Sequence, residues 1–141
     1  MALTITNAEH ISYCSDIGYN YFVREKSISR HFGKSIHDMI YNSKFIRAQV
    51  ESDFPELSKE AERFEIYQHM SFLLSCPSNY DRKEDSLYGE VRTYIKKHMI
   101  AGVKSPCFSM KDKMKLLGVA FFPVTMSRIV EKKASKSRRK R

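Results

Sequence analysis

Apolar residues recur at intervals of three and four along most of this chain, and this spacing constrains the fold more than any other feature. One run extends from Ile36 to Val50, a second lies within residues 55–75, a third within 87–100, and a fourth begins at Met110. Residues three and four apart share one face of a helix, so each run predicts an amphipathic helix with one buried side. Glycine and proline are scarce, at five and four residues, which favours long helices over a loop-rich β fold.

Prolines, glycines and capping residues divide these runs into separate elements. Pro55 fits the first turn of the second helix, whereas Pro123 should kink or divide the apolar segment around it. Asp81 with Glu84 predicts the start of the third helix, and Gly102 is expected to end it. The helix starts marked in this way are Ser35, Asp53, Asp81 and Ser109.

The N-terminal residues 1–32 are the only β-like part of the chain. Residues 11–13 and 17–23 form short apolar or aromatic runs on either side of a turn-like break. We therefore expect a mainly α fold of four to five amphipathic helices, preceded by one or two short N-terminal β-strands. The expected organisation is a short β/loop segment at 1–32, a helical domain at 33–131 and a disordered basic tail at 132–141.

The positive charge is concentrated at the C-terminal end. The whole chain has a formal charge of +9, and eight basic residues face Glu131 alone between Arg128 and Arg141. That segment therefore supplies +7 and leaves +2 for the other residues. A near-neutral body offers no basic groove, which argues against a nucleic-acid binder, because tail-only binding would be weak and sequence-blind.

The cysteines and histidines suggest no metal site. Cys14, Cys76 and Cys107 lie far apart, as expected for reduced packing thiols in a cytoplasmic protein. The histidines fall on separate elements without the spacing of a helical metal site, and they are His10, His31, His37, His69 and His98. The sequence also contains no secretory signal and no apolar run long enough to cross a membrane.

The segment from Leu116 to Val130 is apolar on too much of its circumference for an ordinary solvated helix. One interpretation is that it packs against the other helices and that the basic end only aids solubility. The other is that it attaches the chain to an anionic inner membrane surface, with residues 128–141 supplying the electrostatic attraction. The sequence leaves both interpretations open.

A second candidate site follows the aromatic strand at residues 17–23. Arginine and serine side chains gather there, at Arg24, Ser27, Ser29 and Arg30. Guanidinium groups and hydroxyls suit the oxygens of a pyrophosphate or a sugar, so these four residues are candidate substrate-binding residues. The alternative is a solvated turn in which a serine caps the local backbone.

The run Tyr19-Asn20-Tyr21-Phe22-Val23-Arg24-Glu25-Lys26-Ser27-Ile28-Ser29 resembles the Y-x-Y-x-x-R-x-x-S-I-S element of bacterial family 2 (GT-A type) glycosyltransferases. In that family the element follows the nucleotide-sugar domain and precedes C-terminal helices. The helix start at Phe54-Pro55-Glu56-Leu57 and the pattern of residues 109–133 are also similar to that family. The resemblance implies surface polysaccharide synthesis at the cytoplasmic face of the membrane.

The motifs that would carry the chemistry in such an enzyme cannot be placed here. The chain has no D-x-D element, and Glu84-Asp85 lies at a helix start instead of at a catalytic position. The resemblance therefore implies a C-terminal portion that lacks the nucleotide-sugar-binding domain and is inactive alone, with no catalytic residue, metal ligand or cofactor of its own. A divalent metal would belong to the missing N-terminal domain, which is the expected partner. The alternative function is a small helical membrane-surface or protein-interaction module without catalysis.

Overall fold

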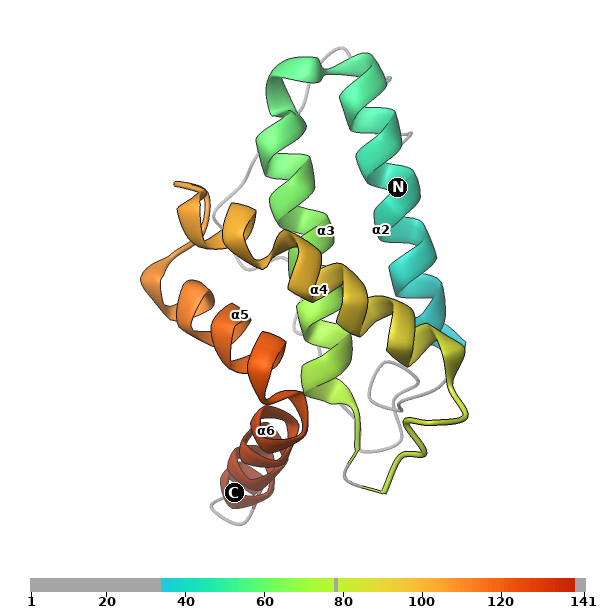
Figure 1. Cartoon of the computed structure of the whole chain (residues 1–141), viewed down its shortest axis with the longest axis vertical. Coiled ribbons are helices and arrows are strands. Elements are labelled where there is room, and N and C mark those ends of the chain that lie inside the picture. The colour runs from blue at the N-terminus through green and yellow to red at the C-terminus, as the bar shows by residue number, and fades with distance from the viewer. Residues whose placement is uncertain (1–33, 78, 139–141) are drawn as a thin grey trace, which may run out of the picture. The chain divides into compact units, whose positions relative to one another are not determined.

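The computed structural model describes residues 34–77 and 79–138, and this part of the chain is helical without a β-strand. It belongs to the second of two units into which the chain divides, residues 32–141. The elements are α2 (Lys34–Asp53), the 3₁₀ turn η2 (Pro55–Leu57), α3 (Ser58–Ser75), α4 (Ser86–Lys104), α5 (Met110–Phe121) and α6 (Pro123–Arg138) (Figure 1). The expectation of a mainly α fold is confirmed for these residues. The predicted N-terminal strands lie outside them.

The first two long helices form an antiparallel pair, joined at the proline that the sequence singled out (Figure 1). The amide of Phe54 still donates to the carbonyl of Val50, at 2.8 Å. Pro55 then occupies the first turn of η2, where its missing N–H costs no hydrogen bond. The Ser58 hydroxyl donates to the Pro55 carbonyl, and α3 begins at that residue.

The start of α4 lies later than Asp81 and Glu84 predict. Its cap is Asp85, whose carboxylate accepts the Leu87 amide at 2.8 Å. The hydroxyl of Tyr80 donates to the same carboxylate, and His37 lies 3.6 Å from it. The expected cap was wrong because Tyr80 from the loop and His37 from α2 hold the Asp85 side chain beside the helix start, whereas Asp81 accepts the Lys83 amide within the loop.

Gly102 does not end α4, which continues to Lys104. The glycine is buried inside the helix, and a Cβ placed on it would lie 2.5 Å from Cδ2 of Leu116 on α5. The missing side chain therefore allows α5 to approach α4 closely. The sequence pattern was misread here because a glycine needed for helix packing looks the same as a glycine that stops a helix.

The core lies around α3, which contacts α2, η2, α4, α5 and α6. Its largest fully buried apolar side chains come from four helices, and they are Ile40, Ile66, Met70, Phe72, Leu73, Val91, Ile95, Leu116 and Val119. Cys76 is also buried, and burial raises the pKa of its thiol. Both described cysteines, Cys76 and Cys107, are free.

The buried face of α3 differs from the one that the apolar spacing predicts. The sequence favours a stripe of Leu57, Ala61, Phe64, Tyr67 or Gln68, Phe72 and Leu73. Ala61, Phe72 and Leu73 are buried, whereas Leu57, Phe64 and Tyr67 are exposed. The buried face instead includes Glu65 and His69, which the pattern assigns to solvent or leaves unassigned. The stripe was right for Ala61, Phe72 and Leu73. It was wrong for its exposed members because Glu65 and His69 find partners on neighbouring helices, which hydrophobic periodicity does not register.

The last helix, α6, begins at Pro123 and extends through the basic residues to Arg138. Pro123 was expected to kink or divide the apolar segment, and it divides it, because α5 ends at Phe121 and α6 begins at Pro123. Residues 132–138, expected to open a disordered tail, are in α6, and residues 139–141 lie outside the described part of the chain. Lysine and arginine are good helix formers, and a cation near a helix C-terminus interacts favourably with the helix dipole.

Candidate functional site

The four candidate substrate-binding residues, Arg24, Ser27, Ser29 and Arg30, lie outside the described residues. Their role in binding a phosphate or a sugar therefore remains a prediction from the sequence. The described helices instead bring together two other groups of side chains. One is an exposed surface formed by α5 and α6, and the other is a polar cluster between α2, α3 and α4.

The outward face of α5 carries a row of apolar side chains. Met110, Met114 and Phe121 are exposed, and Leu117 between them is half-buried. The opposite face of the same helix, with Leu116 and Val119, is buried in the core. The regular apolar stripe of α5 is thus the solvent-facing one. The core therefore accounts for only one of the two apolar faces of this helix.

The apolar row ends at the corner where α5 meets α6. Phe121 and Phe122 stand next to each other with ring centroids 6.5 Å apart, and they are 61% and 67% exposed. The Phe122 amide closes the end of α5 by donating to the Gly118 carbonyl at 2.8 Å. Pro123 then starts α6, so the two rings lie on a fixed turn.

Beside this corner is an open groove of about 480 Å³ with an almost wholly apolar lining. The side chains that line it come from both helices, and they are Met114, Leu117, Phe121, Phe122 and Met126 around Gly118, with Lys115 at the edge. Its volume lies within the range of roughly 300–1,000 Å³ found for small-ligand sites.

Lysines border the apolar row of α5 on both sides. With 3.6 residues per turn, Lys111 and Lys115 fall on one side of the row and Lys113 on the other. Asp112 is the only acidic residue of α5. Its carboxylate accepts from the Ser109 hydroxyl at 2.7 Å and lies 3.0 Å from the Lys115 ammonium. These contacts, the serine first, lower the pKa of the Asp112 carboxyl.

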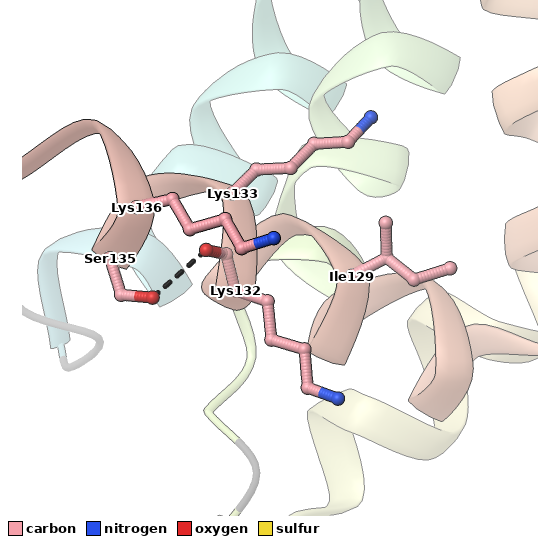
Figure 2. Close-up of a pocket in the computed structure, with 5 residues that line it drawn as sticks. All are labelled: Ile129, Lys132, Lys133, Ser135 and Lys136. Atoms are coloured by element: carbon pink, nitrogen blue, oxygen red, sulfur yellow. Dashed lines mark hydrogen bonds between the residues drawn. The ribbon is translucent and has the colours of Figure 1, made fainter.

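Three more lysines share one side of α6. Lys132, Lys133 and Lys136 surround Ile129 at a shallow site of about 340 Å³, and their ammonium groups extend away from the helix (Figure 2). The Ser135 hydroxyl beside them donates to the Lys132 carbonyl at 2.9 Å. Exposed ammonium groups in one row favour an anionic surface.

The charge of the chain follows this division between helices. Residues 34–109 contain eleven basic and eleven acidic side chains, so their formal charge is zero. Residues 110–138 contain eight basic and two acidic side chains, a formal charge of +6. The +2 that the sequence left for the body is located on α5, beside the apolar row.

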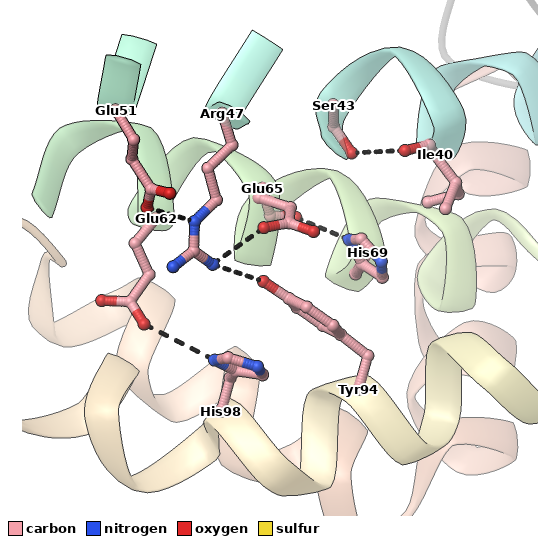
Figure 3. Close-up of polar contacts among 9 residues, drawn as sticks. All are labelled: Ile40, Ser43, Arg47, Glu51, Glu62, Glu65, His69, Tyr94 and His98. Carbon is pink, nitrogen blue, oxygen red and sulfur yellow. Dashed lines mark hydrogen bonds and ion pairs between the residues drawn. The ribbon is translucent and has the colours of Figure 1, made fainter. Parts of the chain in front are cut away.

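The second group of side chains is a polar cluster centred on Arg47 of α2 (Figure 3). Its Nη1 donates to Oε2 of Glu65 at 2.9 Å and to the Tyr94 hydroxyl at 3.3 Å, and its Nε donates to Glu51 at 2.7 Å. The Glu65 carboxylate is almost fully buried, whereas the guanidinium keeps some contact with water. The Arg47 cluster therefore joins three helices through one cation.

Two histidines stack on the tyrosine of this cluster. The rings of His69 and Tyr94 lie 3.9 Å apart, and those of Tyr94 and His98 lie 4.2 Å apart (Figure 3). His69 Nδ1 is 2.8 Å from the Glu65 carbonyl, and burial of the ring lowers the pKa of His69. Burial and the neighbouring Glu65 raise the pKa of the Tyr94 hydroxyl. These shifts keep both rings neutral at pH 7.

The Arg47 cluster has the character of a structural joint. Arg47 is paired with the carboxylates of both Glu51 and Glu65 and also donates to the Tyr94 hydroxyl. Sequence reasoning missed it because its members are spread over Arg47, Glu65 and Tyr94, far apart along the chain. Among the described residues, no group of three or more His, Cys, Asp or Glu side chains is arranged to hold a metal ion. None of the described helices is long and apolar enough to cross a bilayer.

Comparison of this chain with family models, curated proteins and solved structures gave no match.

Proposed function

We propose that this chain attaches to an anionic membrane surface through α5 and α6. The observation that carries this proposal is the apolar row of α5, which faces solvent between lysines although the opposite face of the helix already serves the core. A helix of this kind lies in the interface, with its apolar side chains at the headgroup boundary and its lysines against the phosphates. Nucleic acid would use the lysines but would leave the methionine and phenylalanine side chains in water.

The α6 lysines supply the test of the electrostatic part. On the order of 1 kcal/mol per lysine is expected near an anionic surface, so Lys132→Gln/Lys133→Gln/Lys136→Gln should weaken binding to phosphatidylglycerol-containing vesicles by up to about a hundredfold. The matched control is Lys96→Gln/Lys97→Gln/Lys104→Gln, which removes three exposed lysines from α4. Vesicle flotation measures both. Equal losses in the two variants would contradict attachment through α6.

Point substitutions are preferable to removing residues 128–141. Most of α6 lies in that segment, and α6 packs against α3 and α5. Ser127 at its start is buried, and its hydroxyl donates to the Val124 carbonyl at 3.0 Å. Deletion would therefore disturb the fold as well as the charge, and a loss of binding would have two explanations.

We also propose that this membrane-attached helical part belongs to a family 2-like glycosyltransferase in surface polysaccharide synthesis, at the cytoplasmic face of the membrane. The support is the resemblance of residues 19–30 to the family element and the helices that follow it. In this proposal Arg24, Ser27, Ser29 and Arg30 contact the sugar donor or acceptor, and a separate nucleotide-sugar domain supplies the metal and the base.

The expected result for the isolated chain is no transfer from a UDP-sugar, with or without a divalent metal, in an assay of released UDP. Metal-dependent transfer by this chain alone would contradict the assignment of catalysis to another domain. Transfer that requires this chain together with a D-x-D-containing domain would support it. Vesicle binding is measured separately, so the two proposals succeed or fail independently.

A further inference from the structure

The groove at the α5–α6 corner depends on the absence of a side chain at Gly118. A Cβ placed there would lie 2.9 Å from Sδ of Met126 and 3.1 Å from its terminal methyl. Neither this glycine nor any other described residue has a positive φ, so the backbone does not require it. Instead, the close approach of the Met126 side chain requires a glycine at this position. The floor of the groove is thus a flexible thioether side chain lying across α5, which can move to fit an apolar occupant.

The rim of the groove is positively charged. Lys115 lines it, and Lys111 lies one turn earlier on the same side of α5. Lys115 pairs with Asp112, but its side chain is 47% exposed, and an exposed pair of this kind contributes little to stability. An anionic group could therefore take the place of Asp112 without a large loss.

We propose that this groove holds one acyl chain of an anionic phospholipid, whose phosphate lies against Lys115 and Lys111. The inference rests on the proposed membrane attachment and deepens it, because it replaces a general surface contact with a site for a single lipid. A groove with apolar walls and a basic rim matches both parts of such a molecule. An uncharged apolar segment of another protein would fill the groove but would leave Lys115 at its edge, and Lys111 one turn earlier, without an anionic partner from the occupant.

The test uses a soluble lipid and leaves vesicles out. Dihexanoyl phosphatidylglycerol below its micelle concentration is added to the full chain with ¹³C-labelled methionine methyl groups, and the methyl signals are followed by NMR. The chain has seven methionines, of which Met114 and Met126 line the groove while Met39 and Met70 lie at the α2–α3 side. Shifts are expected at Met114 and Met126 and not at Met39 or Met70.

The key variant is Gly118→Leu, which fills the groove. It is expected to weaken binding of the short-chain lipid about tenfold or more, since a blocked pocket loses the burial of the acyl chain. The matched control is Gly89→Leu on α4, where an added Cβ would meet nothing within 4 Å. Should Gly118→Leu fail to fold, Lys115→Gln provides the second variant, and it should weaken binding of dihexanoyl phosphatidylglycerol more than that of dihexanoyl phosphatidylcholine.

Several results would overturn the inference. Equal binding of the two short-chain lipids would exclude recognition of the net negative charge of the headgroup, and the same methionine shifts with inorganic phosphate would exclude the acyl chain. Shifts that appear with protein concentration alone would show that a second copy covers the groove. Vesicle binding that persists when no short-chain lipid binds would overturn the single-lipid site while leaving the proposed membrane attachment intact.

Discussion

Residues 34–109 and residues 110–138 use their charged side chains in opposite ways. In the first region acids and bases are equal in number, and Arg47 is directed inward to the buried carboxylate of Glu65. In the second region eight basic side chains face two acidic ones. Charge in α2–α4 thus contributes to holding the helices together, whereas α5 and α6 carry an excess of basic side chains. A single pI for the chain conceals this difference.

Exposed aromatic side chains provide the same contrast. Phe45 on α2 and Phe121 on α5 are 62% and 61% exposed, so exposure alone does not distinguish them. Around Phe45 the charges are mixed, since the neighbouring Lys44 lies 3.9 Å from Glu90. Around Phe121 the apolar row continues along α5 between lysines. The surroundings, more than the exposed fraction, distinguish Phe121 as part of the proposed membrane surface.

The largest effect is expected from Glu65→Ala. Removing the buried carboxylate leaves the Nη1 end of the Arg47 guanidinium without its acceptor, while Nε keeps Glu51, so the free energy of unfolding should fall by about 3 kcal/mol. The control is Glu51→Ala, which removes the more exposed partner of the same arginine and should cost less than about 1 kcal/mol. Urea unfolding followed by circular dichroism measures both. Similar losses in the two variants would show that burial does not separate these pairs.

A smaller effect is expected from Phe121→Ser, and it should appear in membrane binding instead of stability. Burying a phenylalanine side chain contributes about 1.5–3 kcal/mol, and part of this is lost, so partition into anionic vesicles should weaken about tenfold. Phe45→Ser is the matched control and should leave partition unchanged. Because both rings are largely exposed, neither substitution should change the unfolding free energy by more than about 1 kcal/mol. Loss of vesicle binding in both variants would erase the contrast between the two regions.

The smallest effect is expected for the pH dependence of stability. Burial holds the pKa of His69 below its ordinary value of 6.5, so the unfolded chain binds more protons than the folded chain just below that pH. The contribution of neutral, buried His69 to the free energy of unfolding is fully present above pH 6.5, and it is lost as the pH falls toward the pKa of His69 in the folded chain. In His69→Asn, urea unfolding between pH 7 and pH 5 should show a weaker decline than in the unsubstituted chain. The other histidines are common to both proteins, so an unchanged slope would contradict the role given to His69.

Local signals predicted the helical part of the fold well. Apolar spacing identified the runs, Pro55 and Pro123 lie where elements change, and Ser109 caps α5. These features depend on neighbours within one turn of the chain, which is the range that sequence patterns describe. The positions that failed depend on distant contacts. Gly102 is inside α4 because of Leu116, and Glu65 is buried because of Arg47.

The candidate membrane surface was predictable in part. The sequence indicated an over-apolar segment and a basic end, but it could not say which face of α5 the core would use. Spacing favoured the row through Met114 as the buried stripe, whereas the side with Leu116 and Val119 packs inward. Two apolar faces on one helix are equivalent in a pattern, and only the packing of α4 against α5 distinguishes them. The groove at Gly118 also requires Met126 from the next helix, so a pattern within α5 alone could not predict it.

The most direct test of membrane attachment uses the absence of tryptophan from this chain, because one introduced tryptophan is then the only such fluorophore. Phe121→Trp on α5 and Phe45→Trp on α2 are compared with vesicles of phosphatidylcholine, with and without phosphatidylglycerol. We expect the emission of Phe121→Trp to shift to the blue and to be quenched by brominated lipid only when phosphatidylglycerol is present, while Phe45→Trp does not change. Unchanged emission from Phe121→Trp with anionic vesicles, or equal shifts in the two variants, would contradict the attachment of α5 and α6 to an anionic membrane.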